Sequence, residues 1–205
     1  MQILHLDSSL LADASASRSL TAALVRELRQ RHPAASVVYR DLVAAPIAHL
    51  DGAIAAGFRP IKSEGAAPSE EHQQSERLVL ELLASDVVVV GAPMYNFSVS
   101  SQLKAWIDRI VQPGRTFRYT ETGPVGLAGG KRVYVASTRG GLYSAGPLTA
   151  MDFQEQYLRA VFRFIGITDV QVVRAENLSR GAQAQAASME AARQAVVEVV
   201  EAADA

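Results

Sequence analysis

Apolar and polar residues follow two different periods along this chain, and the two periods alternate. Short apolar runs bounded by polar or turn residues predict β-strands. Each run is followed by a segment in which apolar residues recur every three to four positions, as on one face of a helix. The predicted strands are 3–6, 37–40, 86–92, 131–137 and 170–175. Strands that alternate with helices predict an α/β fold, with a parallel sheet and helices on both faces.

The predicted strand 86–92 is apolar almost throughout, which is typical of a strand buried on both faces of a parallel sheet. The loop at residues 94–97 follows it directly and carries a Met, a Tyr, an Asn and a Phe. Open α/β sheets bind ligands at this place, outside the carboxyl ends of their strands. Polarizable and aromatic side chains beside one amide suit a flat heteroaromatic ligand. The alternative is that Met94 and Phe97 only complete the hydrophobic core.

The order of the strands in the sheet is predicted from the loops that follow them. Right-handed crossovers leave two common doubly wound orders, 3-2-1-4-5 and 2-1-3-4-5. The loops richest in ligand-type residues follow the first, third and fourth strands. Only the order 2-1-3-4-5 makes all three of these strands neighbours, so that their loops meet at one edge of the sheet. We therefore expect this order.

Two connections are longer than a simple crossover between a strand and a helix needs. They are residues 44–68 and residues 113–130, and both are rich in glycine and proline. Segments of this length are typical of lids or of interfaces, and the sequence leaves both alternatives open. Between them, Ser69 is followed by two glutamates and predicts a helix start. Further helices are predicted over 147–165 and 182–202.

Composition excludes several classes of protein. The 205 residues are expected to form one domain, 1–205, and a net charge of −1 with scattered Lys and Arg gives no electrostatic footprint for nucleic acid. There is no cysteine, which excludes disulfides, cysteine-ligated metals and a thiol nucleophile. No signal peptide precedes the first predicted strand and no apolar run approaches the length of a membrane span. We therefore expect a cytoplasmic protein without a membrane partner.

Metal-dependent and hydrolytic chemistry finds no support in the sequence. The histidines, His5, His32, His49 and His72, share no metal-ligand spacing. We find neither a cluster of metal ligands nor a pair of nucleophile and base, one of which the hydrolysis of a phosphodiester would need. We therefore predict no metal site and no catalytic constellation of side chains.

A serine-rich loop follows the first strand and ends at a predicted helix N-terminus. Unpaired backbone N–H groups and the helix dipole favour an anion there, and Ser9, Ser15 and Ser17 add hydroxyl donors. The alternative is that Ser15 or Ser17 only caps the helix. No glycine occurs before Gly52, so the glycine-rich fingerprint of a dinucleotide site is absent and a monophosphate fits better than a pyrophosphate. Asp41, after the second strand, is then interpreted as a turn or helix-start residue.

Two adjacent glycines, Gly140 and Gly141, follow the fourth strand. A glycine pair commonly forms a plain turn. In the expected sheet, however, this pair faces the loop at residues 94–97. A close approach of its backbone to a ligand is therefore an equally good alternative.

Five motifs follow one another in a fixed order between residues 92 and 169. They are Ala92-Pro93-Met94-Tyr95-Asn96-Phe97, Gln102-Leu103-Lys104, Thr116-Phe117-Arg118-Tyr119-Thr120-Glu121-Thr122-Gly123-Pro124, Thr138-Arg139-Gly140-Gly141 and Phe164-Ile165-Gly166-Ile167-Thr168-Asp169. Together they resemble the FMN-dependent NADH azoreductase and NADH:quinone oxidoreductase family. The resemblance implies a flavodoxin-like fold, a doubly wound five-stranded parallel sheet of order 2-1-3-4-5. It also implies a homodimer with one tightly bound FMN per subunit and active sites at the dimer interface.

The resemblance further implies which residues bind the cofactor. By this match, the phosphate end lies at Ser9, Ser15, Ala16 and Ser17, the isoalloxazine ring at Met94, Tyr95, Asn96 and Phe97, and its other edge at Thr138, Arg139, Gly140 and Gly141. Thr138 replaces the usual serine of the family and keeps the hydroxyl. Ala16 replaces a longer polar residue, so it is expected to contact the phosphate through its backbone only. Tyr119 is expected to border the acceptor pocket, with a packed residue of a β-ribbon as the alternative.

The implied activity is an oxidoreductase reaction in which the flavin, and no side chain, carries the chemistry. NADH or NADPH supplies a hydride, and quinones are reduced by two electrons or aromatic azo compounds are cleaved to amines. Nucleotide and acceptor use the same face of the flavin in turn, which implies ping-pong kinetics. A flavodoxin-type electron carrier is the alternative without enzymatic activity, and a phosphodiester hydrolase is the enzymatic one. A net charge of −1 offers an electron carrier little steering toward its partner.

Overall fold

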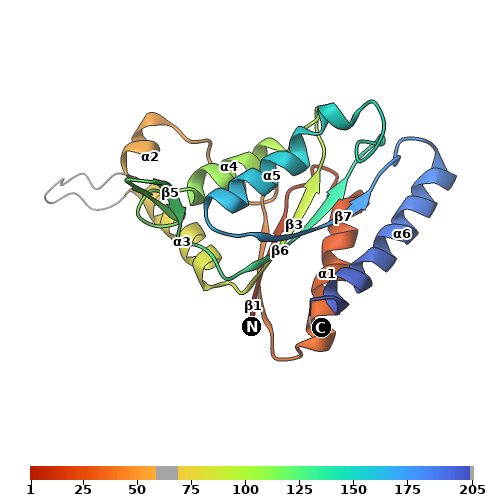
Figure 1. Ribbon diagram of the computed structural model, residues 1–205, viewed down its shortest axis with the longest axis horizontal. Coiled ribbons are helices and arrows are strands. Elements are labelled where there is room, and N and C mark those ends of the chain that lie inside the picture. The colour runs from red at the N-terminus through yellow and green to blue at the C-terminus, as the bar shows by residue number, and fades with distance from the viewer. Residues whose placement is uncertain (59–68, 204–205) are drawn as a thin grey trace, which may run out of the picture.

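The protein is built around one parallel β-sheet (Figure 1). The computed structural model describes residues 1–58 and 69–203. The strands of the sheet lie in the order β2-β1-β3-β6-β7, and every neighbouring pair is parallel. This is the order 2-1-3-4-5 that the loops predict, so the prediction is confirmed. The strands are β1 (Gln2–Asp7), β2 (Ser36–Asp41), β3 (Val87–Pro93), β6 (Arg132–Thr138) and β7 (Asp169–Ala175).

Helices cover both faces of the sheet, which confirms the predicted layers. Several of these helices begin after a polar N-cap residue, whose side-chain oxygen accepts a hydrogen bond from a free N–H of the first turn. Ser15, Ser69, Ser100 and Asp152 act in this way. One face carries α1 (Ala16–Arg31) and α6 (Ala182–Glu201), the other α3 (Glu70–Ala84), α4 (Ser101–Ile110) and α5 (Phe153–Phe164), and the short α2 (Gly52–Ala56) precedes α3.

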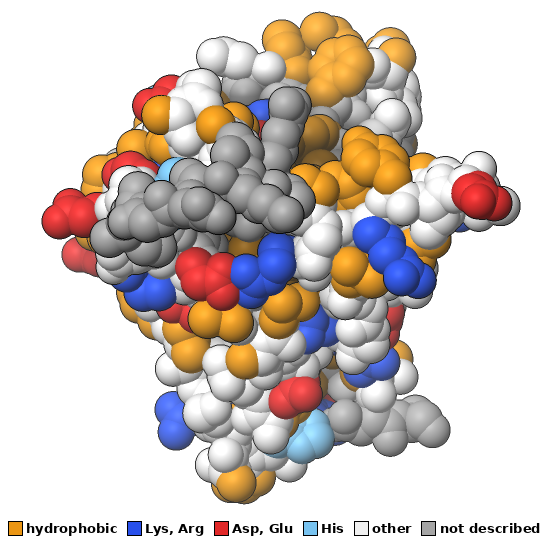
Figure 2. All heavy atoms as spheres, turned by 90° about the vertical axis from the view of Figure 1, so that its left-hand side faces the viewer, with side chains coloured by type: hydrophobic (Ala, Val, Ile, Leu, Met, Phe, Trp, Pro, Cys, Tyr) orange, Lys and Arg blue, Asp and Glu red, His pale blue; other side chains and the backbone are white. Residues whose placement is uncertain are grey.

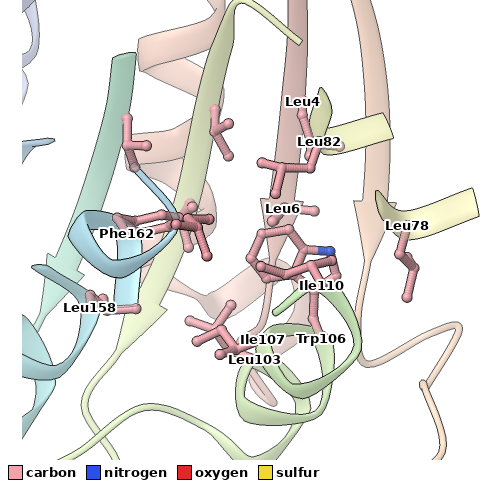
Figure 3. Packing of buried hydrophobic residues seen from close by; sticks show 14 of the residues in the cluster. Leu4, Leu6, Leu78, Leu82, Leu103, Trp106, Ile107, Ile110, Leu158 and Phe162 are labelled. Carbon is pink, nitrogen blue, oxygen red and sulfur yellow. The ribbon is translucent and has the colours of Figure 1, made fainter. Parts of the chain in front are cut away.

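Two hydrophobic clusters, one on each face, hold these layers together. Side chains of a strand alternate between the faces, so Ile3 packs with α1 and α6 while its neighbour Leu4 packs with α3, α4 and α5. Figure 3 shows the cluster on the side of α3, α4 and α5, in which Trp106 of α4 lies near Ile110 and Leu6. All residues of β3 are buried, as expected for its apolar run in the centre of the sheet.

An antiparallel hairpin stands apart from the sheet. It consists of β4 (Phe117–Thr120) and β5 (Gly123–Gly126) and lies at the left of Figure 1. Its second strand packs closely on the end of α5, since a Cβ on Gly126 would collide with the backbone of Gly166. The close approach of Gly126 to Gly166 therefore brings the hairpin against the end of α5.

One segment differs from the prediction and another is not tested. The helix expected over 147–165 starts only after Asp152, and a 3₁₀ turn, Thr149–Met151, precedes it. The long connection 44–68 contains α2, and its residues 59–68 lie outside the described residues, so neither a lid nor an interface is tested there. In the described ranges, no helix is both long enough and apolar enough to cross a membrane.

Candidate functional site

The N-terminus of α1 presents unused hydrogen-bond donors beside two buried serines. Ser15 is the N-cap, and its Oγ accepts a hydrogen bond from the N–H of Arg18 at 3.2 Å. The Oγ of Ser17 lies 3.1 Å from the Oγ of Ser15. Within the described part of the chain, the N–H groups of Ala16 and Ser17 have no hydrogen-bond partner. Ser15 is thus a helix cap, and the free N–H groups favour an anion beside it.

The loop before α1 is fixed by an ion pair that no local pattern in the sequence indicates. Arg18 donates to both carboxylate oxygens of Asp41, at 2.6 and 2.9 Å, and to the carbonyl of Ser9 at 3.2 Å. The hydrogen bond from Arg18 lowers the pKa of Asp41 to about 2, against the opposing effect of burial. Asp41 also accepts from the N–H groups of Val43 and Ala44, which confirms it as a turn residue.

The loop after β3 forms a tight turn in an uncommon backbone conformation. Tyr95 and Ser98 exchange two backbone hydrogen bonds of 3.0 Å, and the residues between them, Asn96 and Phe97, have φ angles of 48° and 72°. Positive φ at both central positions is typical of a type I′ turn, and phenylalanine rarely adopts it. Residues in such strained conformations cluster at ligand sites, where the surrounding structure holds them.

Hydrogen bonds join this turn to the loops after β1 and β6. The N–H of Met94 donates to the carbonyl of Thr138 at 2.8 Å. The hydroxyl of Tyr95 accepts from the N–H of Leu10, in the loop after β1, at 3.1 Å. The loops after the first, third and fourth strands of the sheet therefore meet at its carboxyl edge, as the strand order predicts.

Apolar surface stays open beside the turn. The carbonyl of Phe97 accepts from the N–H of Phe153 at 3.2 Å, and its ring meets the ring of Tyr143 edge-on, with centroids 6.3 Å apart. Phe97 and Phe153 nevertheless remain 39% and 57% exposed. A hollow of about 530 Å³ lies on the α4 side of the turn and is lined by Tyr95 and Tyr157 among others. The turn therefore offers aromatic walls to a flat ligand.

The loop after β6 turns its carbonyl groups to one side and its N–H groups to the other. The carbonyls of residues 139–141 accept hydrogen bonds of 3.0 to 3.1 Å from the N–H groups of residues 177–179, after β7. None of the peptides is cis, and in a trans peptide the following N–H points opposite to the carbonyl. The N–H groups of Gly140, Gly141 and Leu142 therefore point away from the β7 side. They have no partner among the residues that the structure describes.

The two glycines of this loop pack closely against neighbouring side chains. Neither Gly140 nor Gly141 has a φ angle in the left-handed region. A Cβ on Gly140 would lie 2.7 Å from the Oγ of Ser179, and a Cβ on Gly141 would lie 3.3 Å from the ring of Tyr143. A side chain at either position would therefore crowd Ser179 or Tyr143, and the approach of the two glycines to a ligand stays a prediction.

The side chain of Arg139 is buried among three carboxylates, two at the start of α5 and one directly after β7. It is fully buried, with its guanidinium 2.8 Å from Asp152 and 3.4 Å from both Glu155 and Glu176. Its Nε donates to the Oγ of Ser137 at 2.9 Å. The family resemblance implies that Arg139 is among the cofactor-binding residues, and this geometry leaves such a contact to its backbone.

Tyr119 is separated from the other predicted site residues within one chain. It lies on the β4–β5 hairpin at the left of Figure 1, whereas the loop after β6 lies at the upper right. Its ring meets that of Phe117 edge-on, with centroids 5.3 Å apart, but Tyr119 is 74% exposed. The remaining predicted residues gather at the carboxyl edge of the sheet, and Tyr119 does not join them.

Two groups without a predicted role also shape the site. Glu176 directly follows β7. The predicted strand order could have identified it as a site residue, because the loops after neighbouring parallel strands meet at one edge of the sheet. Gln154 is fully buried in α5, accepts from the Oγ of Ser137 at 2.6 Å and donates to the carbonyl of Ala92 at 3.0 Å. It joins α5 to β3 and β6. No sequence signal marks this bridge, since Gln154 fits an ordinary helix.

The chain is similar to known proteins over almost its whole length. A family model described as "Flavodoxin-like fold" matches residues 1–200. A protein of Ralstonia nicotianae named FMN-dependent NADH:quinone oxidoreductase is 68% identical over 202 residues, 98% of this chain and 97% of the relative. A protein of Xanthomonas euvesicatoria named FMN-dependent NADH:quinone oxidoreductase 2 is 59% identical over 202 residues, 98% of this chain and 94% of the relative.

Solved structures are also similar to this chain over almost its whole length. A crystal structure of an azoreductase from Bacillus anthracis has a TM-score of 0.87 at 25% identity and covers 97% of this chain and 98% of its own. The azoreductase AzrA has a TM-score of 0.83 at 26% identity, with 97% and 100% coverage. The resemblance that the five motifs indicate is therefore confirmed. Sheet order, loop geometry and these similarities together show that the chain belongs to the flavodoxin-like fold family.

Proposed function

We propose that this protein is an FMN-dependent oxidoreductase that uses NADH or NADPH to reduce quinones by two electrons and to cleave aromatic azo compounds to amines. The observation that carries the proposal is the set of N–H groups of Gly140, Gly141 and Leu142. They share one side of a loop and have no partner within the described ranges. Fixed donors of this kind stabilise negative charge that develops on a cofactor during reduction. The names of the relatives support the same reaction.

The carboxyl edge of the sheet fits both ends of FMN. The free N–H groups of Ala16 and Ser17, at the N-terminus of α1, suit a phosphate, and the buried hydroxyls of Ser9 and Ser15 lie in the same segment. The exposed ring of Phe97, on a turn held from several sides, offers apolar support to a flat ring system. When bound, FMN supplies the transfer of a hydride from the nucleotide to the acceptor.

The chain itself contributes binding, orientation and electrostatics. The turn at residues 94–97 is proposed to cover one side of the ring, so that nucleotide and acceptor have to use the other side in succession. We therefore keep ping-pong kinetics as part of the proposal. The N–H groups of Gly140 and Gly141 would stabilise negative charge on the cofactor without transferring a proton. This role is consistent with the sequence, which predicts no acid–base pair.

A homodimer is also part of the proposal, because it gives Tyr119 a place at a site. Tyr119 is remote from the loops of its own chain, and Val125 and Leu127 on and beside β5 are each 40% exposed. Figure 2 views the molecule from the side of the hairpin and shows hydrophobic side chains exposed among charged ones. In a dimer with sites at the interface, residues 113–130 of one subunit reach the site of the other. A cytoplasmic location completes the proposal.

Cofactor titration and steady-state kinetics test the proposed function. The apoprotein should take up one FMN per chain and then oxidise NADH with a quinone as acceptor. With an azo dye, it should consume two NADH per dye molecule, because cleavage of the azo bond to two amines takes four electrons. A protein that does not take up FMN would refute the proposal. A flavin-loaded protein that reduces neither quinone nor dye would favour the electron carrier.

A further inference from the structure

One carboxylate attaches the loop after β6 to the loop after β7. We call residues 139–144 the donor loop, because they carry the free N–H groups. The Oε1 of Glu176 accepts from the N–H groups of Tyr143, at 2.8 Å, and of Ser144, at 2.9 Å. Its Oε2 accepts from the hydroxyl of Ser144. Among the described residues, no other side chain accepts a hydrogen bond from the backbone of the donor loop. Glu176 therefore fixes the far end of this loop.

Glu176 is held as an ionised carboxylate. Its side chain is only 11% exposed, and Oε1 lies 3.4 Å from the guanidinium of Arg139. Burial disfavours the charge, but the hydrogen bonds from Ser144 and Tyr143 and the charge of Arg139 outweigh it and lower the pKa of Glu176 below its ordinary value. An ionised acceptor forms shorter and stronger hydrogen bonds than a neutral one. The anchor is therefore strong at neutral pH.

The direction of the free N–H groups is set by the hydrogen bonds that the carbonyls of residues 139–141 accept from residues 177–179, and the two ends of the donor loop limit how far the loop can move. At the start, the N–H of Arg139 donates to the carbonyl of Ala175 at 2.9 Å. At the far end stands Glu176. Between these anchors lie Gly140 and Gly141, which have the largest backbone freedom of any residue type and no side chain to pack. The hydrogen bonds from residues 177–179 end at the carbonyl of Gly141, and Glu176 holds the chain beyond it. Loss of this anchor would let the loop move and leave the donors less well ordered, and donors act best when they are ordered beforehand.

We propose that Glu176 is a positioning residue. Through the backbone of Tyr143 and Ser144, it holds the N–H groups of the donor loop in the arrangement that stabilises the reduced cofactor. The inference rests on the proposed function, since the cofactor is the proposed FMN. Glu176 itself touches neither cofactor nor substrate and acts only through the donor loop.

Charge-matched variants separate positioning from charge. E176Q and E176A both remove the negative charge, but only the glutamine keeps an oxygen that can accept from both N–H groups. In E176A, the affinity for reduced FMN relative to oxidised FMN should fall about tenfold below that of E176Q, which corresponds to a midpoint potential ~30 mV more negative for a two-electron couple. E176D keeps the charge but is one methylene shorter, so its potential should shift in the same direction from the wild type. If E176A does not fold, the comparison of E176D with the wild type tests the positioning role instead.

Glu155 is the matched control for Glu176. Glu155 lies at the same 3.4 Å from the guanidinium of Arg139, and its side chain is 13% exposed. Its other partners are Arg159 and Arg174, and it accepts from no backbone N–H of the donor loop. E155Q and E155A are therefore expected to differ in stability but to share one midpoint potential.

Amide exchange of the apoprotein gives a second result that does not depend on the cofactor. The N–H groups of Tyr143 and Ser144 should be protected in the wild type and in E176Q and should exchange rapidly in E176A. Equal midpoint potentials in E176Q and E176A would overturn the positioning role, and so would a shift of the same size between E155Q and E155A. A wild type that binds no FMN would overturn the proposed function and this inference together.

Discussion

Replacing Ser15 and Ser17 by alanine tests the phosphate end of the proposed site. Both side chains are buried at the N-terminus of α1, with their hydroxyls 3.1 Å apart. Hydrogen bonds to a charged group contribute more than those to a neutral one, so the double variant should bind FMN about 1–3 kcal/mol more weakly, a factor of roughly 5 to 150 in Kd. Riboflavin lacks the phosphate, and its affinity should stay nearly unchanged.

The same double variant should also lose stability, because Ser15 caps α1. Loss of an N-cap costs about 1 kcal/mol, or about 2–4 °C in Tm for a chain of this length. Ser100→Ala is the matched control, since Ser100 is the N-cap of α4, accepts from an N–H at the same 3.2 Å and is equally buried. The control should lose similar stability and keep its affinity for FMN.

Fluorescence titration of FMN and of riboflavin with each apoprotein measures both affinities under the same conditions. The ratio of the two dissociation constants is the decisive quantity, because a general distortion of the site weakens both ligands. A large change in this ratio for the double variant, with none for Ser100→Ala, is the expected result. Equal losses for FMN and riboflavin would show that Ser15 and Ser17 are only a cap and its neighbour, and would refute the phosphate site.

Other changes test the remaining parts of the molecule. Gly141→Val would place methyl groups against the ring of Tyr143, so FMN affinity should fall in a titration while the circular dichroism of the apoprotein is kept, and an unchanged affinity would make Gly141 an ordinary turn residue. Pairing with Arg18 lowers the pKa of Asp41 from 3.8 to about 2, so its contribution to stability is complete above pH ~4 and is lost as the pH falls toward 2. Urea unfolding should therefore show Asp41→Asn less stable than the wild type at neutral pH, with a difference that shrinks at low pH, and a constant difference would contradict the ion pair. Reciprocal plots of initial rate against NADH at several quinone concentrations should be parallel, and intersecting lines would exclude a shared flavin face. Light scattering should find an active dimer, whereas a fully active monomer would contradict the proposed role of the hairpin.

The sheet and its loops could be predicted because their signals are local. The apolar run of β3 predicts a central strand by itself, and the positions of the serine, aromatic and glycine loops then select one strand order. Ser69 predicts a helix start in the same way, through its own hydroxyl and two acids that follow. The predicted start of α5 was wrong. Apolar periodicity runs on from 147, but the carboxylate of Asp152 accepts from the N–H groups of Gln154 and Glu155 and sets the first turn there.

Contacts between distant segments could not be predicted. Arg139 follows a strand and precedes two glycines, so its sequence context suggests a loop residue at the ligand edge. Its burial depends on Asp152, Glu155 and Glu176, which come from α5 and from the loop after β7. No periodicity links these positions. A buried guanidinium needs several acceptors at once, and only the folded sheet brings the three carboxylates together.

Protein contacts fix the loops of the proposed site, so we expect this site to be formed before a cofactor binds. The strained φ of Phe97 illustrates this, since an isolated chain would leave such a conformation. Three contacts oppose this relaxation: the paired Tyr95 and Ser98, the N–H of Phe153, and the ring of Tyr143. Tyr143 is in turn held by Glu176. The turn that would support the flavin ring and the donors that would face its edge thus share one chain of contacts. Binding energy is then not spent on ordering either loop, which favours tight binding of a cofactor that has to stay in place while two other molecules come and go.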